Sequence, residues 1–128
     1  MFSGWPWAAA PLLIAAFLAP SEAAAHALLS KSDPARRAVL SKPPAQLRLW
    51  FNERLEPAFS SASVLNAAGK PVTATPAEVA REDPKLLRLA LPPLAPGAYS
   101  VHYQVLSIDG HTVKASFQFT VKEPAAAK

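Results

Sequence analysis

The chain contains no cysteine, and its only methionine is Met1. Without cysteine no disulfide can stabilise the fold, so a hydrophobic core must hold it together. The same absences exclude a metal site of the soft thiolate or thioether type in the rest of the chain. Long apolar runs are missing as well. The run 7–18 covers about 12 residues, whereas a transmembrane helix needs roughly 20.

Charges of one sign are not clustered. The 13 basic and 9 acidic side chains are interleaved along the sequence, with a formal net charge of +4. A nucleic-acid surface needs a basic cluster with exposed aromatic side chains, so we expect no nucleic-acid partner. A sustained 3.6-residue apolar period is also absent, which excludes a helical domain. Only the segment 76–81 could form a helical turn.

The first 25 residues, 1–25, have the organisation of a secretory signal peptide. The apolar run is followed by the polar break Pro20-Ser21-Glu22 and by alanines at the −3 and −1 positions of a cleavage site. We predict export with cleavage after Ala25. Cleavage one or two residues earlier, or a retained membrane anchor, is the alternative. Removal of the leader removes one acid, Glu22, which leaves 13 basic and 8 acidic side chains and a formal charge of +5.

The remaining sequence predicts one domain, 26–122, followed by a Pro- and Ala-rich tail, 123–128, that we expect to be disordered. Apolar and polar residues alternate in short segments that Pro, Gly and Asn separate. Seven segments are predicted as strands: 27–30, 46–52, 61–65, 72–75, 86–91, 99–105 and 113–121. This pattern indicates an all-β fold, a seven-stranded antiparallel Greek-key β-sandwich or small barrel of immunoglobulin-like type.

Two residues of the segment 99–105 carry specific predictions. Tyr99 ends the sequence Leu-Ala-Pro-Gly-Ala-Tyr, which resembles a tyrosine corner, in which the phenol hydroxyl bonds back to nearby backbone. His102 falls on the polar face of the strand and matches no motif. We therefore expect His102 to be exposed and to bind no metal.

Cleavage after Ala25 would make His26 the first residue of the exported protein. Its α-amine and imidazole Nδ1 could then close on one metal ion as a six-membered chelate. Roughly 85 residues downstream, Asp109 and His111 flank Gly110, and in extended backbone such positions project to one face. Taken singly, Asp109-Gly110 is an ordinary turn signal, and His111 an ordinary surface histidine. Together, three nitrogen donors and one oxygen donor suit Cu(II) better than zinc or calcium.

These motifs resemble the copper-resistance CopC family, and the resemblance covers nearly all of 26–122. It rests on His26-Ala27-Leu28-Leu29-Ser30, Ser32-Asp33-Pro34-Ala35, Leu47-Arg48-Leu49-Trp50-Phe51-Asn52-Glu53, the segment 94–99 and Ser107-Ile108-Asp109-Gly110-His111. It implies a periplasmic β-sandwich that binds one Cu(II) per chain. The implied ligands are His26, through amine and imidazole, Asp109 and His111.

The resemblance also draws attention to Glu53, because many members carry a glutamate near the copper at this position. Glu53 is expected to be an axial or outer acceptor, or to orient the terminal amine. A solvated carboxylate at the end of a strand is the other interpretation. Some members also carry a methionine-rich Cu(I) site. This sequence departs from them, since it has no methionine beyond Met1.

The implied function is a soluble Cu(II) carrier or buffer that acts as a monomer without chemical turnover. The family implies a CopD-type inner-membrane copper transporter as partner, while resistance, supply and sequestration stay open as roles. One alternative is a copper-dependent oxidative enzyme with a histidine brace. It is disfavoured because Asp109 would fill the position that dioxygen needs. The other alternative is an immunoglobulin-like interaction domain without metal.

Overall fold

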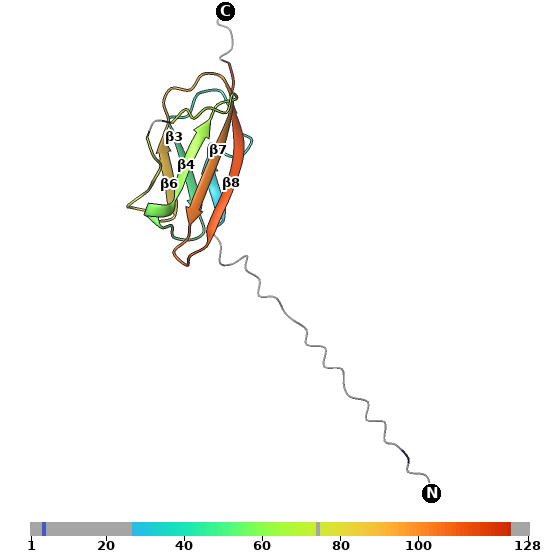
Figure 1. Ribbon diagram of the computed structural model, residues 1–128. Coiled ribbons are helices and arrows are strands. Elements are labelled where there is room, and N and C mark those ends of the chain that lie inside the picture. Colours follow the sequence, from blue (N-terminus) through green and yellow to red (C-terminus); the bar gives the residue numbers. More distant parts are fainter. Residues whose placement is uncertain (1–3, 5–26, 74, 124–128) are drawn as a thin grey trace, which may run out of the picture.

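The computed structural model describes residues 4, 27–73 and 75–123. Its elements are β1 (Leu29–Asp33), β2 (Val39–Leu40), β3 (Gln46–Phe51), the 3-10 turn η2 (Pro57–Phe59), β4 (Ser61–Leu65), β5 (Glu78–Val79), β6 (Leu86–Ala90), β7 (Gly97–Leu106) and β8 (Thr112–Val121). The strands form two four-stranded sheets, β1-β3-β6-β5 and β2-β8-β7-β4 (Figure 1). The predicted all-β sandwich is confirmed, with eight strands in the described ranges where seven were expected.

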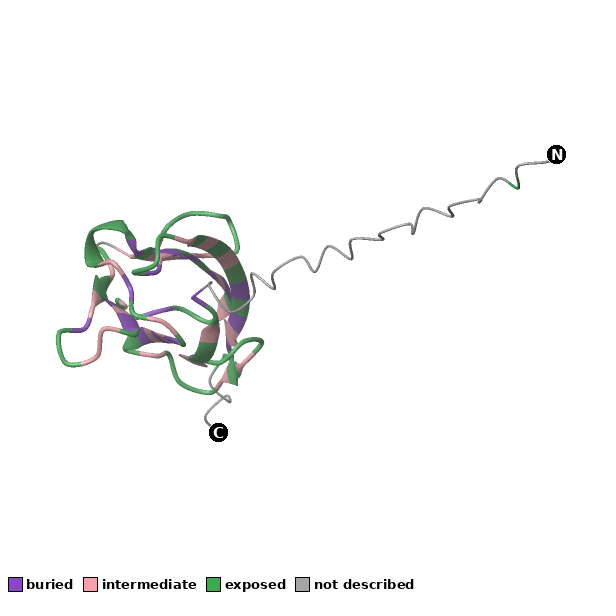
Figure 2. Cartoon of the chain, turned by 90° about the horizontal axis from the view of Figure 1, so that it is seen from below, coloured by how far each residue is buried: buried purple, intermediate pink, exposed green. Residues whose placement is uncertain are grey.

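The core lies between the two sheets, and buried residues alternate with more exposed ones along the long strands (Figure 2). In β3 the inward side chains of Leu47 and Leu49 have no exposed surface. Phe51 of β3 contacts Tyr103 of β7 edge-on, with the ring centroids 5.5 Å apart, so this aromatic pair joins the two sheets. Among the described residues, no helix has the length and hydropathy that a membrane span requires.

The prediction of a strand at 72–75 is wrong. After β4 the chain turns back at 66–70. Among the described residues that follow, the pairing with β4 consists of a bridge between Leu65 and Pro71 and a 2.9 Å hydrogen bond from the Val72 N–H to the Val64 carbonyl. Pro71 has no N–H with which to extend this ladder. The alternation that the sequence shows here therefore produces a short return of the chain instead of a strand.

The prediction of a helical turn at 76–81 is also wrong, because this segment contains β5. Val79 pairs with Leu87 and packs against the core, while the Glu78 carboxylate accepts a 3.2 Å hydrogen bond from Arg88. The strand β2, which was not predicted, is equally short and pairs in parallel with β8. Two residues are too few to show alternation, so neighbouring strands decide these elements. The other strand pairs of the described chain are antiparallel, as expected.

Tyr99 forms the predicted tyrosine corner. Its hydroxyl donates a 2.5 Å hydrogen bond to the Ala95 carbonyl. Its ring is 6% exposed and stacks on Phe119, with the centroids 5.5 Å apart. Since Tyr99 lies near the start of β7, the corner fixes the end of the sandwich that is opposite to the β7–β8 turn.

We expect the substitution Tyr99→Phe to lower the free energy of unfolding by about 0.5–1.5 kcal/mol, because it removes one hydrogen bond and keeps the stacked ring. Metal affinity should not change, since the corner and the β7–β8 turn lie at opposite ends of β7. Urea unfolding and metal titration measure the two quantities. Weaker metal binding by a stably folded variant would contradict a purely structural role for Tyr99.

Candidate metal centre

The turn between β7 and β8 carries Asp109 and His111. The Gly110 N–H donates to the Ser107 carbonyl (2.9 Å), and the Ser107 N–H donates to the His111 carbonyl (3.0 Å). Gly110 has a φ of 95°, which residues with a side chain rarely adopt. The expectation that 109–111 is extended is therefore wrong. A tight turn, and not the pleat of a strand, brings Asp109 and His111 together.

Within this turn the Asp109 Oδ1 lies 3.4 Å from the His111 Nδ1, and the two side chains are 43% and 41% exposed. The hydroxyl of Ser107 donates a hydrogen bond to the same Asp109 oxygen. This bond is the main reason why the pKa of Asp109 lies below its ordinary value, while partial desolvation opposes the shift and His111 adds to it. Asp109 is therefore an anionic oxygen donor at neutral pH.

The geometry of Asp109 and His111 is compatible with one bound ion. Bonds from first-row metals to nitrogen or oxygen are about 2.0–2.2 Å long, so two donors on one ion lie roughly 3 to 4 Å apart. The observed distance of 3.4 Å falls in this range. Among the described residues, however, no group of three His, Cys, Asp or Glu side chains could hold a metal. The pair needs donors from elsewhere.

The predicted third ligand, His26, lies outside the described residues, but the structure fixes the two residues that follow it. Ala27 is 1% exposed and belongs to the hydrophobic core. The Leu28 N–H donates to the Asn52 Oδ1 (2.6 Å), and the Asn52 N–H donates back to the Leu28 carbonyl (3.0 Å). The start of the described range 27–73 is therefore held next to Asn52, the residue that precedes Glu53.

The segment 52–56 connects this start to the β7–β8 turn. The Ile108 N–H donates to the Arg54 carbonyl (3.0 Å), and Leu55 forms a bridge with Ser107. Glu53 is partly buried within this segment. The segments 27–28, 52–56 and 107–111 thus lie together at one end of the sandwich, which we call the metal end; it is the lower end in Figure 1.

The sequence interpretation gave no role to Ser107, although the signal was present. Ser107 continues the inward series Tyr99, Val101, Tyr103 and Val105, and it is 1% exposed. A polar side chain at an inward strand position needs a hydrogen-bond partner. A serine at such a position, two residues before an aspartate, was therefore a candidate to donate a hydrogen bond to the aspartate carboxylate.

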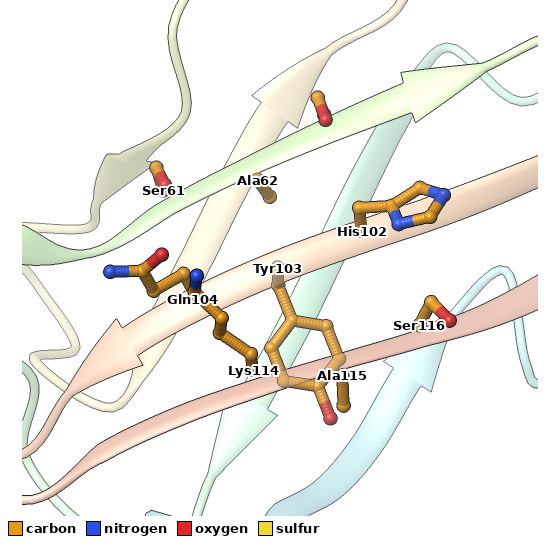
Figure 3. Close-up of a pocket in the computed structure, with 9 residues that line it drawn as sticks. Ser61, Ala62, His102, Tyr103, Gln104, Lys114, Ala115 and Ser116 are labelled. Carbon is orange, nitrogen blue, oxygen red and sulfur yellow. The ribbon is translucent and has the colours of Figure 1, made fainter. Parts of the chain in front are cut away.

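A hollow of about 500 Å³ lies on the outer face of the sheet β2-β8-β7-β4 (Figure 3). His102 lines it and is exposed, as predicted, with its Nε2 3.2 Å from the Ser100 hydroxyl. Lys114 and Ser116 of β8 also line the hollow. The described residues around it include no carboxylate and no second histidine, so its lining does not match a metal site.

Comparison with known proteins places this architecture in a family. The sequence from 29 to 122 matches the family profile described as the CopC domain. The chain belongs to the CopC family. The copper resistance protein C of Xanthomonas campestris pv. juglandis is 36% identical to this CopC-family chain over 129 residues, which cover 95% of this chain and 100% of that protein.

Two further relatives match over shorter stretches of this chain. Protein YobA of Escherichia coli (strain K12) is 35% identical over 99 residues, which cover 77% of this CopC-family chain and 80% of YobA. The copper transport protein CutJ of Bacillus subtilis (strain 168) is 31% identical over 111 residues, which cover 86% of this chain and 20% of CutJ. The CopC-like part of CutJ is therefore one segment of a much longer chain.

Solved structures agree with the family membership. CopC from Methylosinus trichosporium OB3b superimposes with a TM-score of 0.73 at 36% identity, covering 80% of this chain and 99% of that one. PcoC from Escherichia coli, described as a methionine-rich copper resistance protein, gives a TM-score of 0.68 at 29% identity, covering 76% and 99%. The present CopC-family chain shares the fold of PcoC but has a single methionine, Met1.

Proposed function

We propose that this CopC-family chain is a periplasmic carrier or buffer that holds one Cu(II) at the metal end. The observation that carries the proposal is the pair formed by Asp109 and His111, 3.4 Å apart, at the end of the sandwich where the described range 27–73 starts. His26 would complete the site through its amine and its imidazole Nδ1 once cleavage after Ala25 frees it. Three nitrogens and one oxygen are a donor set typical of Cu(II).

The position of Ala27 supports the participation of His26. Consecutive Cα atoms are about 3.8 Å apart, so residue 26 lies within one such step of a buried, fixed residue. The terminal amine therefore does not have to be recruited from a long tail. A donor that is held close to its final position loses little conformational entropy on binding.

We propose Glu53 as an axial or outer acceptor, or as the group that orients the terminal amine. Its support is the position of the segment 52–56, which contacts both the chain start and the β7–β8 turn. The oxidation state follows from the donors. Since the sequence beyond Met1 offers no sulfur, nitrogen and oxygen must bind the metal, and these donors suit Cu(II) better than Cu(I).

The proposed role involves no chemical turnover, because Asp109 and the three nitrogens would fill the four equatorial positions. The protein would act as a monomer and exchange copper with a CopD-type transporter of the inner membrane. The relation to CutJ supports this partner, because a CopC-like segment forms part of that longer copper transport protein. A carrier and a transporter that act in sequence are natural candidates for fusion in one chain.

The direct test of the proposal uses protein recovered from the periplasmic fraction. Its intact mass should show a chain that begins at His26, and titration should give one Cu(II) per chain. His111→Ala should weaken binding, whereas His102→Ala should not. His102 lines the hollow on the outer face of β4, β7 and β8 and is not part of the proposed site. A chain that begins at Ala24 or Ala25, or that binds no stoichiometric copper, would refute the proposed site.

A further inference from the structure

Ser107 is held by the core, in contrast to the exposed turn that follows it. The residue is 1% exposed and forms a bridge with the buried Leu55. Its backbone N–H donates to the His111 carbonyl (3.0 Å), and its carbonyl accepts from the Gly110 N–H (2.9 Å). Residues 108–110 are all exposed. Burial and the Leu55 bridge thus anchor Ser107 in the folded domain, and its backbone bonds tie the turn to that anchor.

This hydroxyl contacts both proposed ligands of the turn. It donates its hydrogen to the Asp109 Oδ1, and it accepts a hydrogen bond from the His111 backbone N–H at 3.4 Å. A hydroxyl has one donor hydrogen and two acceptor lone pairs, so both bonds can form at once. The oxygen that Ser107 holds is also the one that faces the His111 Nδ1.

An aspartate at the tip of an exposed turn would ordinarily sample several rotamers, and a metal would have to select one of them at an entropic cost. A hydrogen bond from a buried group removes most of that freedom before the metal arrives. Groups that orient metal ligands in this way strongly affect metal affinity in other proteins. Ser107 has the position and the partner that such a role requires.

We propose that Ser107 is a positioning residue for copper, whose buried hydroxyl holds Asp109 beside His111 in the metal-free protein. The inference rests on the function proposed above, because it assigns Ser107 a role at that same site. Ser107 acts through Asp109 and does not itself contact the ion. It links the end of β7 in the core to the chemistry of the exposed turn.

The first experiment measures Cu(II) affinity by competition with a chelator. Ser107→Ala should raise the dissociation constant by about 10–100-fold and keep one ion per chain. Ser107→Thr retains the hydroxyl and should restore most of the affinity. Ser100→Ala is the matched control, because it removes a hydroxyl of β7, the strand that leads into Ser107, and the partner of that hydroxyl is His102. This control should bind copper like the unmodified protein.

A double-mutant cycle separates positioning from a general structural effect. If Ser107 acts through Asp109, then Ser107→Ala should change the affinity less than about twofold in an Asp109→Ala background. An equal loss in both backgrounds would overturn the inference. So would an unchanged affinity of Ser107→Ala in a protein that binds copper normally, and that result would leave the proposed function intact. If the unmodified chain binds no stoichiometric copper, both proposals fall.

A measurement on the unmodified metal-free protein needs no variant to fold. Scalar couplings about the Cα–Cβ bond of Asp109 should show a single χ1 rotamer in solution. Rotamer averaging of Asp109 as extensive as that of an aspartate in a short unfolded peptide would overturn the inference. A single rotamer that becomes averaged in Ser107→Ala would support it directly.

Discussion

Apparent Cu(II) affinity should fall by about 10⁵-fold between pH 7.5 and pH 5, because the copper must displace protons from one α-amine and two imidazoles. In small peptides such groups titrate near pH 7.8 and 6.5, so protons compete with copper for nitrogen donors more strongly as the pH falls to 5. The carboxylate of Asp109 does not contribute to this loss. Its pKa is lowered, chiefly by the Ser107 hydrogen bond, and it stays ionised as the pH falls to 5.

Competition titrations at a series of pH values measure this dependence. The logarithm of the affinity should fall with a slope that steepens towards three protons per copper as the pH drops below about 6.5. The control is an unfolding curve of the metal-free protein at pH 5, which should show that the domain is still folded at that pH. Equal affinities at pH 5 and pH 7.5 would refute nitrogen ligation of the copper.

One alanine added before His26, or acetylation of its amine, should lower Cu(II) affinity by more than roughly 100-fold. A loss of up to about 100-fold is typical when a residue that only hydrogen-bonds to a metal ligand is changed. Either change removes a direct donor and opens the chelate ring, yet it alters no side chain of the protein. The fold should persist, since the contacts of Ala27 and Leu28 with the core and with Asn52 do not involve the added group.

Electron paramagnetic resonance of the Cu(II) form provides the readout. The unmodified protein should show three nitrogens and one oxygen, and the extended protein should show fewer or rearranged nitrogens. An alanine added after Lys128 is the matched control and should change nothing. If the extended chain kept the affinity and the spectrum, the terminal chelate would be wrong. Asp109 and His111 would then have to bind copper with donors other than the terminal amine.

The longer strands were predictable because one face of each lies in the core. β3, β7 and β8 show this alternation clearly in the sequence. The short strands β2 and β5 and the segment 72–75 were not predictable in the same way. Their backbone pairing depends on other strands: β2 pairs with β8, β5 with β6, and the segment after the turn at 66–70 with β4. The alternating pattern that reveals a strand lies in those partners and not in the short segments.

The closeness of Asp109 and His111 was predictable, but the backbone geometry that produces it was not. Asp109 and His111 were identified by their spacing, yet the turn at Gly110 brings them together where an extended backbone was expected. The contribution of Asn52 could not be foreseen, because its contact with Leu28 joins residues that are 24 positions apart. His26 and Glu53 remain predictions of the sequence and its resemblance to the family.

The topology gives bound copper a second consequence. β1 follows His26 and belongs to one sheet, whereas the turn with Asp109 and His111 belongs to the other. An ion held by all three would join two points roughly 85 residues apart, and a link of that span restricts the unfolded chain by about 4–5 kcal/mol in the chain-entropy treatment of cross-links. In this chain without cysteine, the cargo would replace the missing disulfide. The loaded carrier would then outlast the empty one among the proteases of the cell envelope.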